Sequence, residues 1–284
     1  MLSYNMDETQ LQMIDLARKI GKEKILPVRA ELDETGRFPW DIMGILAEAG
    51  LFGIYIPEEY GGFGFGNFEN CLVVEELSKY CIGVSVSFAA SGLGAYPILL
   101  FGSDEQKKKY LPDIAAGKKI AAFGITESGA GSDAGAIRTT ATRKDDKYVL
   151  NGVKQWITNG GEAETYSVIA KTDKSKGARG ASAFVLDKDI PGFTFGKKEN
   201  KLGIRASATR ELIFEDCEIP AENILGREGQ GFIVAMKTFD QTRTGIAAQA
   251  VGLAQGALDM AIKHFRPSFI IHLNLYAEIR VLFD

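Results

Sequence analysis

Histidine, cysteine and surplus charge are all scarce in this chain of 284 residues. Only His264 and His272 occur, both near the C-terminus, so neither a histidine-based triad nor a metal site is expected in the main body. The three cysteines have no metal or redox spacing and predict free thiols in a reducing compartment. A net charge of −4 gives no electrostatic basis for binding nucleic acid or an anionic membrane.

Targeting and membrane signals are also lacking. The opening "MLSYNMDETQLQ" has neither the basic nor the apolar region of a signal peptide, and no transit peptide is seen, so we expect a cytoplasmic protein. Residues 80–103 carry no charge and are long enough to span a bilayer. Serines, glycines and Pro97 dilute their hydrophobicity, and no basic cluster flanks them. We therefore expect a helix buried inside a helical domain, and no membrane span.

The hydrophobic period changes twice along the chain. Residues 1–119 read as helices, residues 120–229 as short strands separated by turn signals, and residues 230–284 as helix again. The strand spacing suits a barrel or a sandwich. We predict an α+β multidomain protein with an N-terminal helical domain, a middle β-barrel domain and the start of a C-terminal helical-bundle domain.

Several local signals set element boundaries. Thr9 with Gln12 predicts a capping box, Pro27 the end or bend of the first helix, and Gly50 a helix C-terminus. The sequences "KDDK" and "LNGV" predict hairpin turns. Small residues at three- and four-residue spacing after residue 229 suit close helix packing.

The stretch "TESGAGSDAGA", residues 126–136, is the most glycine-rich in the chain. Gly129, Gly131 and Ala134 fit the dinucleotide fingerprint G-x-G-x-x-[G/A]. That fingerprint requires a helix to open inside the loop, whereas "AIRTTATRKDDKYVLNG" reads as strand, turn and strand. The sequence therefore argues against a Rossmann site. A phosphate cradle of backbone N–H groups, with the Ser132 hydroxyl added, remains open beside the plainer alternative of a flexible β-connection.

Longer motifs decide between these alternatives. "FGITESGAGSD" followed by "NGVKQWITNG" resembles the acyl-CoA dehydrogenase family, whose typical forms are T-E-P-G-A-G-S-D and N-G-x-K-x-W-I-T-N-G. Further agreement lies in "PEEYGG", "KLGIRAS", "FEDCEIPAENILG" and "VGLAQGALDMA". The resemblance covers about residues 5–263. It implies FAD as cofactor and an acyl-CoA thioester as substrate. Such enzymes remove a proton from Cα and pass a hydride from Cβ to flavin N5, giving a trans-2-enoyl-CoA.

The resemblance also implies where the cofactor would lie. One flavin-contacting segment runs from residue 123 to residue 132, and the "WITNG" motif supplies the second. Ile125 and Thr126 would contact the ring, Ser132 the pyrophosphate and the substrate, and Thr158 the neighbourhood of N5. The implied cofactor-binding residues are Phe123, Ile125, Thr126, Gly131, Ser132, Trp156, Ile157 and Thr158. From the residues alone, Trp156 reads as a core aromatic, and Glu127 reads as a residue that orders the loop.

A substrate turn and a missing base complete the expectations. The sequence "FDQTR" resembles the family's substrate contact and implies substrate-binding roles for Asp240, Gln241, Thr242 and Arg243, beside Ser132. From spacing alone, Asp240 and Arg243 read as a surface ion pair. Most of the family place the catalytic glutamate beyond residue 284, and a minority place it at the position of Thr242, which cannot act as a base. We therefore name no catalytic residue in this sequence.

The tail departs from the family after "LDMAIKH". An Arg-x-x-F-G segment is expected there, but the sequence reads "FRPSFIIHLNLYAEIRVLFD", in which Pro267 would interrupt the helix. We interpret this as a truncated or frameshifted member of the family with an aberrant tail from about residue 264. Intact relatives are tetramers or dimers, so the helix from residue 229 would expose a large apolar patch. We expect poor solubility and little or no dehydrogenase activity.

Three functions remain open at this point. The first is dehydrogenation of a short- or medium-chain acyl-CoA, with electrons passed to an electron-transfer flavoprotein. The second is a related flavin oxidase or monooxygenase that uses oxygen. The third is an inactive homologue that binds flavin or CoA at most.

Overall fold

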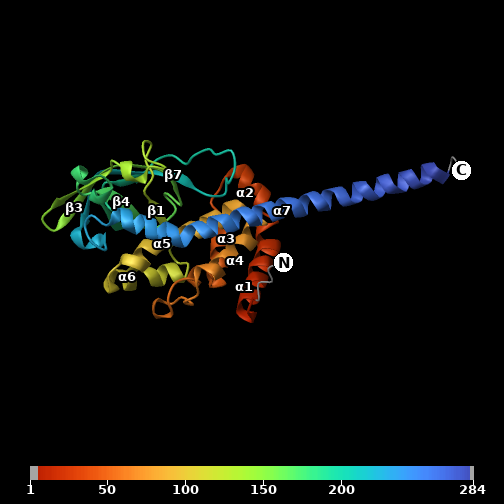
Figure 1. The fold of residues 1–284 in the computed structure, drawn as a ribbon, viewed down its shortest axis with the longest axis horizontal. Coiled ribbons are helices and arrows are strands. Elements are labelled where there is room, and N and C mark those ends of the chain that lie inside the picture. The colour runs from red at the N-terminus through yellow and green to blue at the C-terminus, as the bar shows by residue number, and fades with distance from the viewer. Residues whose placement is uncertain (1–5, 282–284) are drawn as a thin grey trace.

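The N-terminal region of the protein is a layer of helices (Figure 1). The computed structural model describes residues 6–281, with side chains described for residues 6–265. Helices of this region are α1 (Glu8–Ile20), α2 (Arg29–Thr35), α3 (Trp40–Glu48), α4 (Asn67–Ser78), α5 (Ile82–Phe101) and α6 (Asp104–Ala115). Short helical turns join them: η1 (Gly21–Ile25), η2 (Leu51–Gly53) and η3 (Glu58–Tyr60). The predicted helical character of the first region is confirmed.

Caps and breakers act at most of the predicted positions. Helix α1 begins two residues earlier than the sequence suggests, because Asp7 with Gln10 forms the capping box. The prediction of Thr9 with Gln12 is therefore wrong, since a carboxylate acceptor was available two residues closer to the chain start. Before Pro27 the helix widens into the π-helical turn η1 and ends. Gly50 takes the left-handed conformation after α3, as predicted.

Helix α5 is the central helix of this layer. It is buried over most of its length, and its window of membrane-like composition is 67% buried inside the protein. A second helix, residues 231–265 of α7 (Gly231–Val281), also has the length and composition of a membrane span but is 22% buried. Two such helices are weak evidence for a membrane protein, and burial explains the apolar character of α5.

The middle region is an eight-stranded sheet. Its strands are β1 (Ala121–Gly124), β2 (Thr140–Lys144), β3 (Lys147–Thr158), β4 (Thr165–Lys171), β5 (Ala181–Asp187), β6 (Phe193–Phe195), β7 (Thr209–Pro220) and β8 (Ile224–Leu225). The turns η4 (Ala134–Ala136), η5 (Lys174–Gly180) and η6 (Ala221–Asn223) lie between them. The hydrogen-bonded order is β6-β7-β3-β2-β4-β5-β8, with β1 parallel to β4. Among the described strands no ladder joins β6 to β8, so the path is open where a barrel is predicted.

One of the two predicted hairpin turns is present. Asp145 takes a positive φ between β2 and β3, which confirms "KDDK". The "LNGV" segment instead lies inside β3, so that prediction is wrong. The neighbouring strand β7 carries an extra residue opposite it, and Asn151 exchanges two hydrogen bonds with Asp216 at this bulge. Asparagine and glycine here accommodate a bulge of the partner strand and do not reverse the chain.

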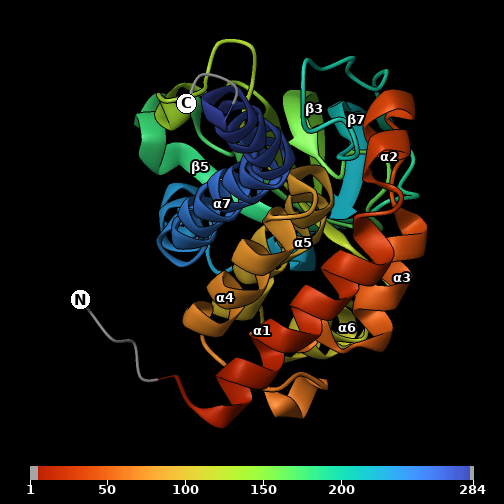
Figure 2. The same cartoon turned by 90° about the vertical axis from the view of Figure 1, so that its right-hand side faces the viewer.

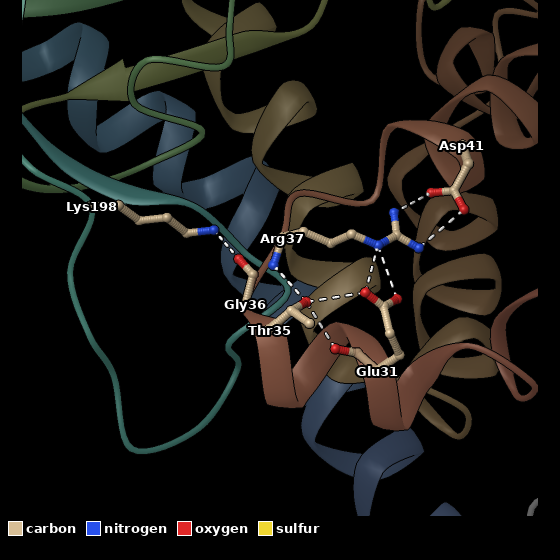
Figure 3. Close-up of polar contacts among 6 residues, drawn as sticks. All are labelled: Glu31, Thr35, Gly36, Arg37, Asp41 and Lys198. Carbon is tan, nitrogen blue, oxygen red and sulfur yellow. Dashed lines mark hydrogen bonds and ion pairs between the residues drawn. The ribbon is translucent and has the colours of Figure 1, made fainter.

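A loop of the middle region is fastened to the helical layer. Figure 3 shows Lys198 donating to the Gly36 carbonyl at the C-terminus of α2. Arg205 adds bonds to the Asp33 and Glu34 carbonyls of the same helix end. These cations satisfy carbonyls that have no partner within the helix. Arg37 beyond α2 is held by the carboxylates of Glu31 and Asp41.

Helix α7 crosses the helical layer and packs on α4 and α5. Figure 2 shows α4 between α1 and α7. A Cβ on Gly252 or Gly256 would lie 2.0 and 2.2 Å from the carbonyl oxygens of Glu75 and Lys79 on α4. The predicted close packing through small residues is therefore confirmed. Helix α7 continues through Pro267, so the predicted break there is wrong. A proline removes one backbone hydrogen bond from a helix, and helices α5 and α6 also continue through a proline. Side chains from residue 266 lie outside the described residues.

The other face of α7 remains apolar and exposed, as the sequence predicts. Its exposed large side chains are Ile233, Ile246, Val251, Leu253, Leu258, Met260, Ile262 and Phe265. A contiguous apolar helix face of this kind marks an interaction surface or an aggregation hazard.

Replacing Gly252 with alanine tests the α4–α7 contact. The new methyl group would force the helices apart, so we expect the free energy of unfolding to fall by about 1–3 kcal/mol. Gly44, in helix α3, is the control, because a Cβ there meets nothing within 4 Å. Gly44→Ala should instead stabilise by about 0.5–1 kcal/mol through helix propensity. Denaturant unfolding measures both; equal stabilities of the two variants would contradict the packing.

Candidate flavin and acyl site

Two segments far apart in sequence meet where strands β1 and β3 end. The first leaves β1 and forms the loop of residues 125–132, and the second is the end of β3. The backbone N–H of Gln155 donates to the Thr126 carbonyl at 2.8 Å, which joins them directly. The structure therefore brings together the two segments in which the cofactor-binding residues are predicted.

Trp156 lies on the surface at this junction. Its side chain is 57% exposed, which excludes the core role that the residue type suggests. Strand β3 carries an extra residue opposite β7 between Lys154 and Ile157, and Trp156 takes φ +58° in this bulge. A left-handed conformation is costly for a bulky residue, and such strain gathers at ligand sites. The bulge turns the indole outward while Ile157 stays buried and Thr158 half-buried.

The glycine-rich loop presents free backbone donors. Phe123 and Ile125 are buried at its base, while Gly131 and Ser132 are exposed at its tip. Within the described part of the chain, the N–H groups of Thr126, Gly131 and Ser132 donate to no protein atom. A Cβ on Gly129 or Gly131 would meet nothing within 4 Å. Open space next to unpaired N–H groups fits a phosphate cradle. A short η4 turn and then β2 follow the loop, so the Rossmann alternative fails as predicted.

A buried ion pair lies beneath the loop. Lys154 on β3 and Glu127 in the loop are 2.7 Å apart, and their side chains are 0% and 9% exposed. Glu127 also accepts bonds from the N–H groups of Arg138 and Thr139. Its role in ordering the loop, read from the sequence, is confirmed. The sequence reading missed Lys154, because a lysine within a strand normally indicates an exposed position.

The two charges shift each other's titration. Burial lowers the pKa of Lys154 to about 8, against the opposing attraction of Glu127. Burial alone would raise the pKa of Glu127, but the Lys154 ammonium and the donors of Thr139 and Arg138 lower it below its usual value. Both groups are therefore charged at neutral pH.

A cavity of about 350 Å³ opens beside Thr158, between α5 and α7. Thr242 and Arg243 line the same cavity, so predicted cofactor and substrate residues meet there. Its remaining lining residues are Asn70, Val86, Ala89, Ala90, Gly92, Leu93, Tyr96, Phe239, Gly245, Ile246 and Gln249. The mostly apolar walls suit a hydrocarbon chain. The sequence did not predict that α5 forms a wall of this cavity, because hydrophobic periodicity shows that a helix is buried but not which elements it contacts.

Other predicted residues lie outside this lining. Asp240 is exposed and lies 3.8 Å from Lys237, and Arg243 donates to the Phe239 carbonyl, so the Asp240–Arg243 ion pair suggested by spacing is absent from the described contacts. Gln241 is half-buried outside the cavity lining. Ser132 and Gly131 lie in the exposed part of the loop. Among the described residues that line the cavity, none carries a carboxylate.

A larger cavity, of about 480 Å³, lies at the opposite end of β3 and β7. Charged side chains including Asp146, Glu215 and Asp216 line it, and its lining includes none of the predicted cofactor- or substrate-binding residues. Size alone therefore does not identify the functional site.

The fold, the paired loops and the apolar cavity define a flavoprotein-like dehydrogenase architecture, and comparison with known proteins gives the family. Family models match residues 7–118 (acyl-CoA dehydrogenase, N-terminal domain), 122–217 (middle domain) and 229–268 (C-terminal domain). The chain belongs to the acyl-CoA dehydrogenase family.

Individual relatives agree with this assignment. The short-chain specific acyl-CoA dehydrogenase of Clostridium acetobutylicum is 46% identical over 261 residues, which span 92% of this chain and 69% of the relative. A structure described as the electron transferring flavoprotein of Acidaminococcus fermentans matches with a TM-score of 0.90 and 50% identity, over 92% of this chain and 69% of that one. An acyl-CoA dehydrogenase complexed with FAD from Bacillus anthracis matches with a TM-score of 0.84 and 36% identity, over 91% and 44% of the chains.

The buried pair predicts a pH dependence of stability. Because the folded pKa of Lys154 is about 8 and its unfolded value is near 10.5, the unfolded chain binds more protons between these values. The contribution of Lys154 to the free energy of unfolding should therefore rise from pH 8 to pH 10. Denaturant unfolding of the wild type and Lys154→Met across this range isolates the effect. A stability difference that does not change with pH would contradict the assignment.

Proposed function

We propose that the chain binds FAD and a short- or medium-chain acyl-CoA thioester for α,β-dehydrogenation, with electrons passed to an electron-transfer flavoprotein. The single observation that carries this proposal is the meeting of Thr158 with Thr242 and Arg243 in one apolar cavity. Membership of the family and the names of the relatives support it. We also propose a cytoplasmic homo-oligomer, a tetramer or dimer, because the apolar face of α7 is exposed.

The residues present fit a flavin. When bound, FAD supplies the acceptor for a hydride from the substrate Cβ. The exposed Trp156 ring provides a flat wall, and the unpaired N–H groups of Thr126, Gly131 and Ser132 provide donors for the ring edge and the pyrophosphate. The side chains of Phe123, Ile125 and Ile157 are buried, which anchors the segments that carry these donors in the core.

The cavity would hold the acyl chain. Small side chains of α5, such as Ala89 and Ala90, leave the space, and Leu93, Tyr96 and Phe239 limit it. Apolar walls remove water from the reacting carbons, which strengthens electrostatic effects there. Thr158 and Arg243 add polar groups at the wall for orienting the thioester.

Removal of the Cα proton requires an acceptor within direct reach or through one water. No carboxylate lies among the described residues of the cavity lining, and Thr242 cannot accept the proton at neutral pH. This observation favours a different candidate function, that of a homologue that binds flavin and acyl-CoA with little turnover. An oxygen-using relative stays a further alternative, distinguished by oxygen consumption.

FAD binding can be tested with the two tryptophans of the chain. We expect the purified protein to take up FAD, and Trp156→Ala to weaken binding about tenfold or more, since the variant loses a stacking surface. Trp40→Ala is the matched control, because Trp40 is similarly exposed but lies on α3. Isothermal titration calorimetry gives each dissociation constant. Equal constants in all three proteins, or no uptake by any, would refute the site.

The absence of a carboxylate from the described cavity lining can be tested by placing one there. We expect slow butyryl-CoA oxidation by the FAD-loaded wild type and at least tenfold faster oxidation by Thr242→Glu, whose carboxylate would enter the cavity. Ala30→Glu adds the same charge at an exposed position of α2, outside the cavity lining and on a different helix from α7, and should leave the rate unchanged. A dye-coupled assay without oxygen measures the oxidation rate. Oxygen consumption in the presence of oxygen tests the oxidase alternative. Fast turnover by the wild type would overturn the expected lack of a base.

A further inference from the structure

Burying the Glu127–Lys154 pair costs desolvation free energy, so the pair contributes little net stability to the fold. Both charges are almost completely removed from water, and desolvation of a buried pair commonly cancels its Coulombic gain. Well-packed apolar residues would serve general stability as well. The hydrogen bonds of the pair, in contrast, impose a specific local geometry.

That geometry concerns Thr126. Lys154 Nζ donates both to Glu127 Oε1 at 2.7 Å and to the Ile125 carbonyl at 3.2 Å, so it holds the residues on each side of Thr126. The next residue of β3, Gln155, donates to the Thr126 carbonyl itself. Three consecutive residues of the loop are thus fixed to two consecutive residues of β3, directly before Trp156.

Glu127 extends the constraint to the far end of the loop. Its carboxylate accepts from the N–H groups of Arg138 at 2.6 Å and Thr139 at 2.9 Å. One side chain therefore closes the base of the loop between residues 127 and 139. The tip, which carries Gly131 and Ser132, needs no backbone partner of its own.

We propose that Glu127 and Lys154 are positioning residues that lock the glycine-rich loop against the Trp156 bulge, so that the donors of the loop and the indole form one preformed surface. The proposal rests on the proposed function for the identity of the cofactor. The locked geometry itself is independent of any ligand.

A polarising effect accompanies the positioning. The peptide bond between Ile125 and Thr126 accepts the Lys154 ammonium at its carbonyl, while its N–H has no acceptor among the described residues. Accepting a charged donor strengthens the N–H of the same peptide as a donor, because the two dipoles reinforce each other. The Thr126 N–H is therefore a stronger donor than an ordinary amide.

Hydrogen exchange and FAD titration of three variants test this role. Lys154→Met and Glu127→Gln each remove one charge with similar volume, and the double variant removes both. The control is Lys147→Met, which breaks an exposed ion pair with Glu218, 2.9 Å long, on the same strand. Exchange is measured on the apo protein, and FAD affinity by titration at pH 7.

We expect at least tenfold faster exchange at the amides of Ala130, Thr139 and Gln155 in Lys154→Met, with β4 and β5 unchanged. The FAD dissociation constant should rise at least tenfold. The double variant should lose no more affinity than Lys154→Met, since the pair acts as a unit. The control should match the wild type within twofold.

Other outcomes would overturn the role. Faster exchange throughout the sheet, or a lower melting temperature with an unchanged FAD affinity, would reduce the pair to a general stabiliser. Unchanged exchange in the loop would refute positioning directly. Failure of the wild type to bind FAD would count against the proposed function alone. The locked geometry is tested separately, by the amide exchange rates of the apo protein.

Discussion

The close approach of helix α5 to strand β1 is the constraint on which the remaining architecture depends. Ser91 accepts a hydrogen bond from the Ala121 N–H, and a Cβ on Gly94 would lie 2.5 Å from the Ala122 nitrogen. Asn159, at the end of β3, donates to carbonyls of both Ser87 on α5 and Ala121 on β1. Small side chains on one face of α5 therefore let a helix lie directly on a strand edge. A larger residue at Gly94 would separate the two regions.

The site follows from this contact. Because α5 is held against β1, its opposite face meets α7, and the space between the two helices becomes the cavity beside Thr158. Phe123 on β1 packs edge-on against Phe239 on α7, which ties the first strand of the sheet to the helix that lines the cavity. The proposed cofactor and substrate residues thus lie on elements whose spacing is fixed by backbone contact, which favours a preorganised site.

The sequence predicts the order of the elements and the helix ends near Pro27 and Gly50, because these depend on local periodicity and turn chemistry. The two proposed flavin segments rest instead on the family resemblance. It could not predict which face of α5 would form the cavity wall, since Ala89, Leu93 and Tyr96 read simply as buried. It misread "LNGV" because the bulge that this segment accommodates belongs to another strand. Lys154 was missed for a similar reason: its partner Glu127 is far along the chain, and only the fold brings the two charges together.

The buried charges answer a requirement that backbone hydrogen bonds cannot meet. A loop that offers its N–H groups to a ligand must leave them unpaired, so it cannot also be held by them. The carbonyls of the loop and its side chains must hold it instead. Glu127 and Lys154 hold the start of the loop. Near its end, Lys171 donates to the Gly135 carbonyl and also to the Gly177 carbonyl of η5, which links the two segments. All of these contacts use loop carbonyls, side chains or the N–H groups of Arg138 and Thr139 beyond the tip. The donors of Thr126, Gly131 and Ser132 stay free because charged side chains carry the ordering.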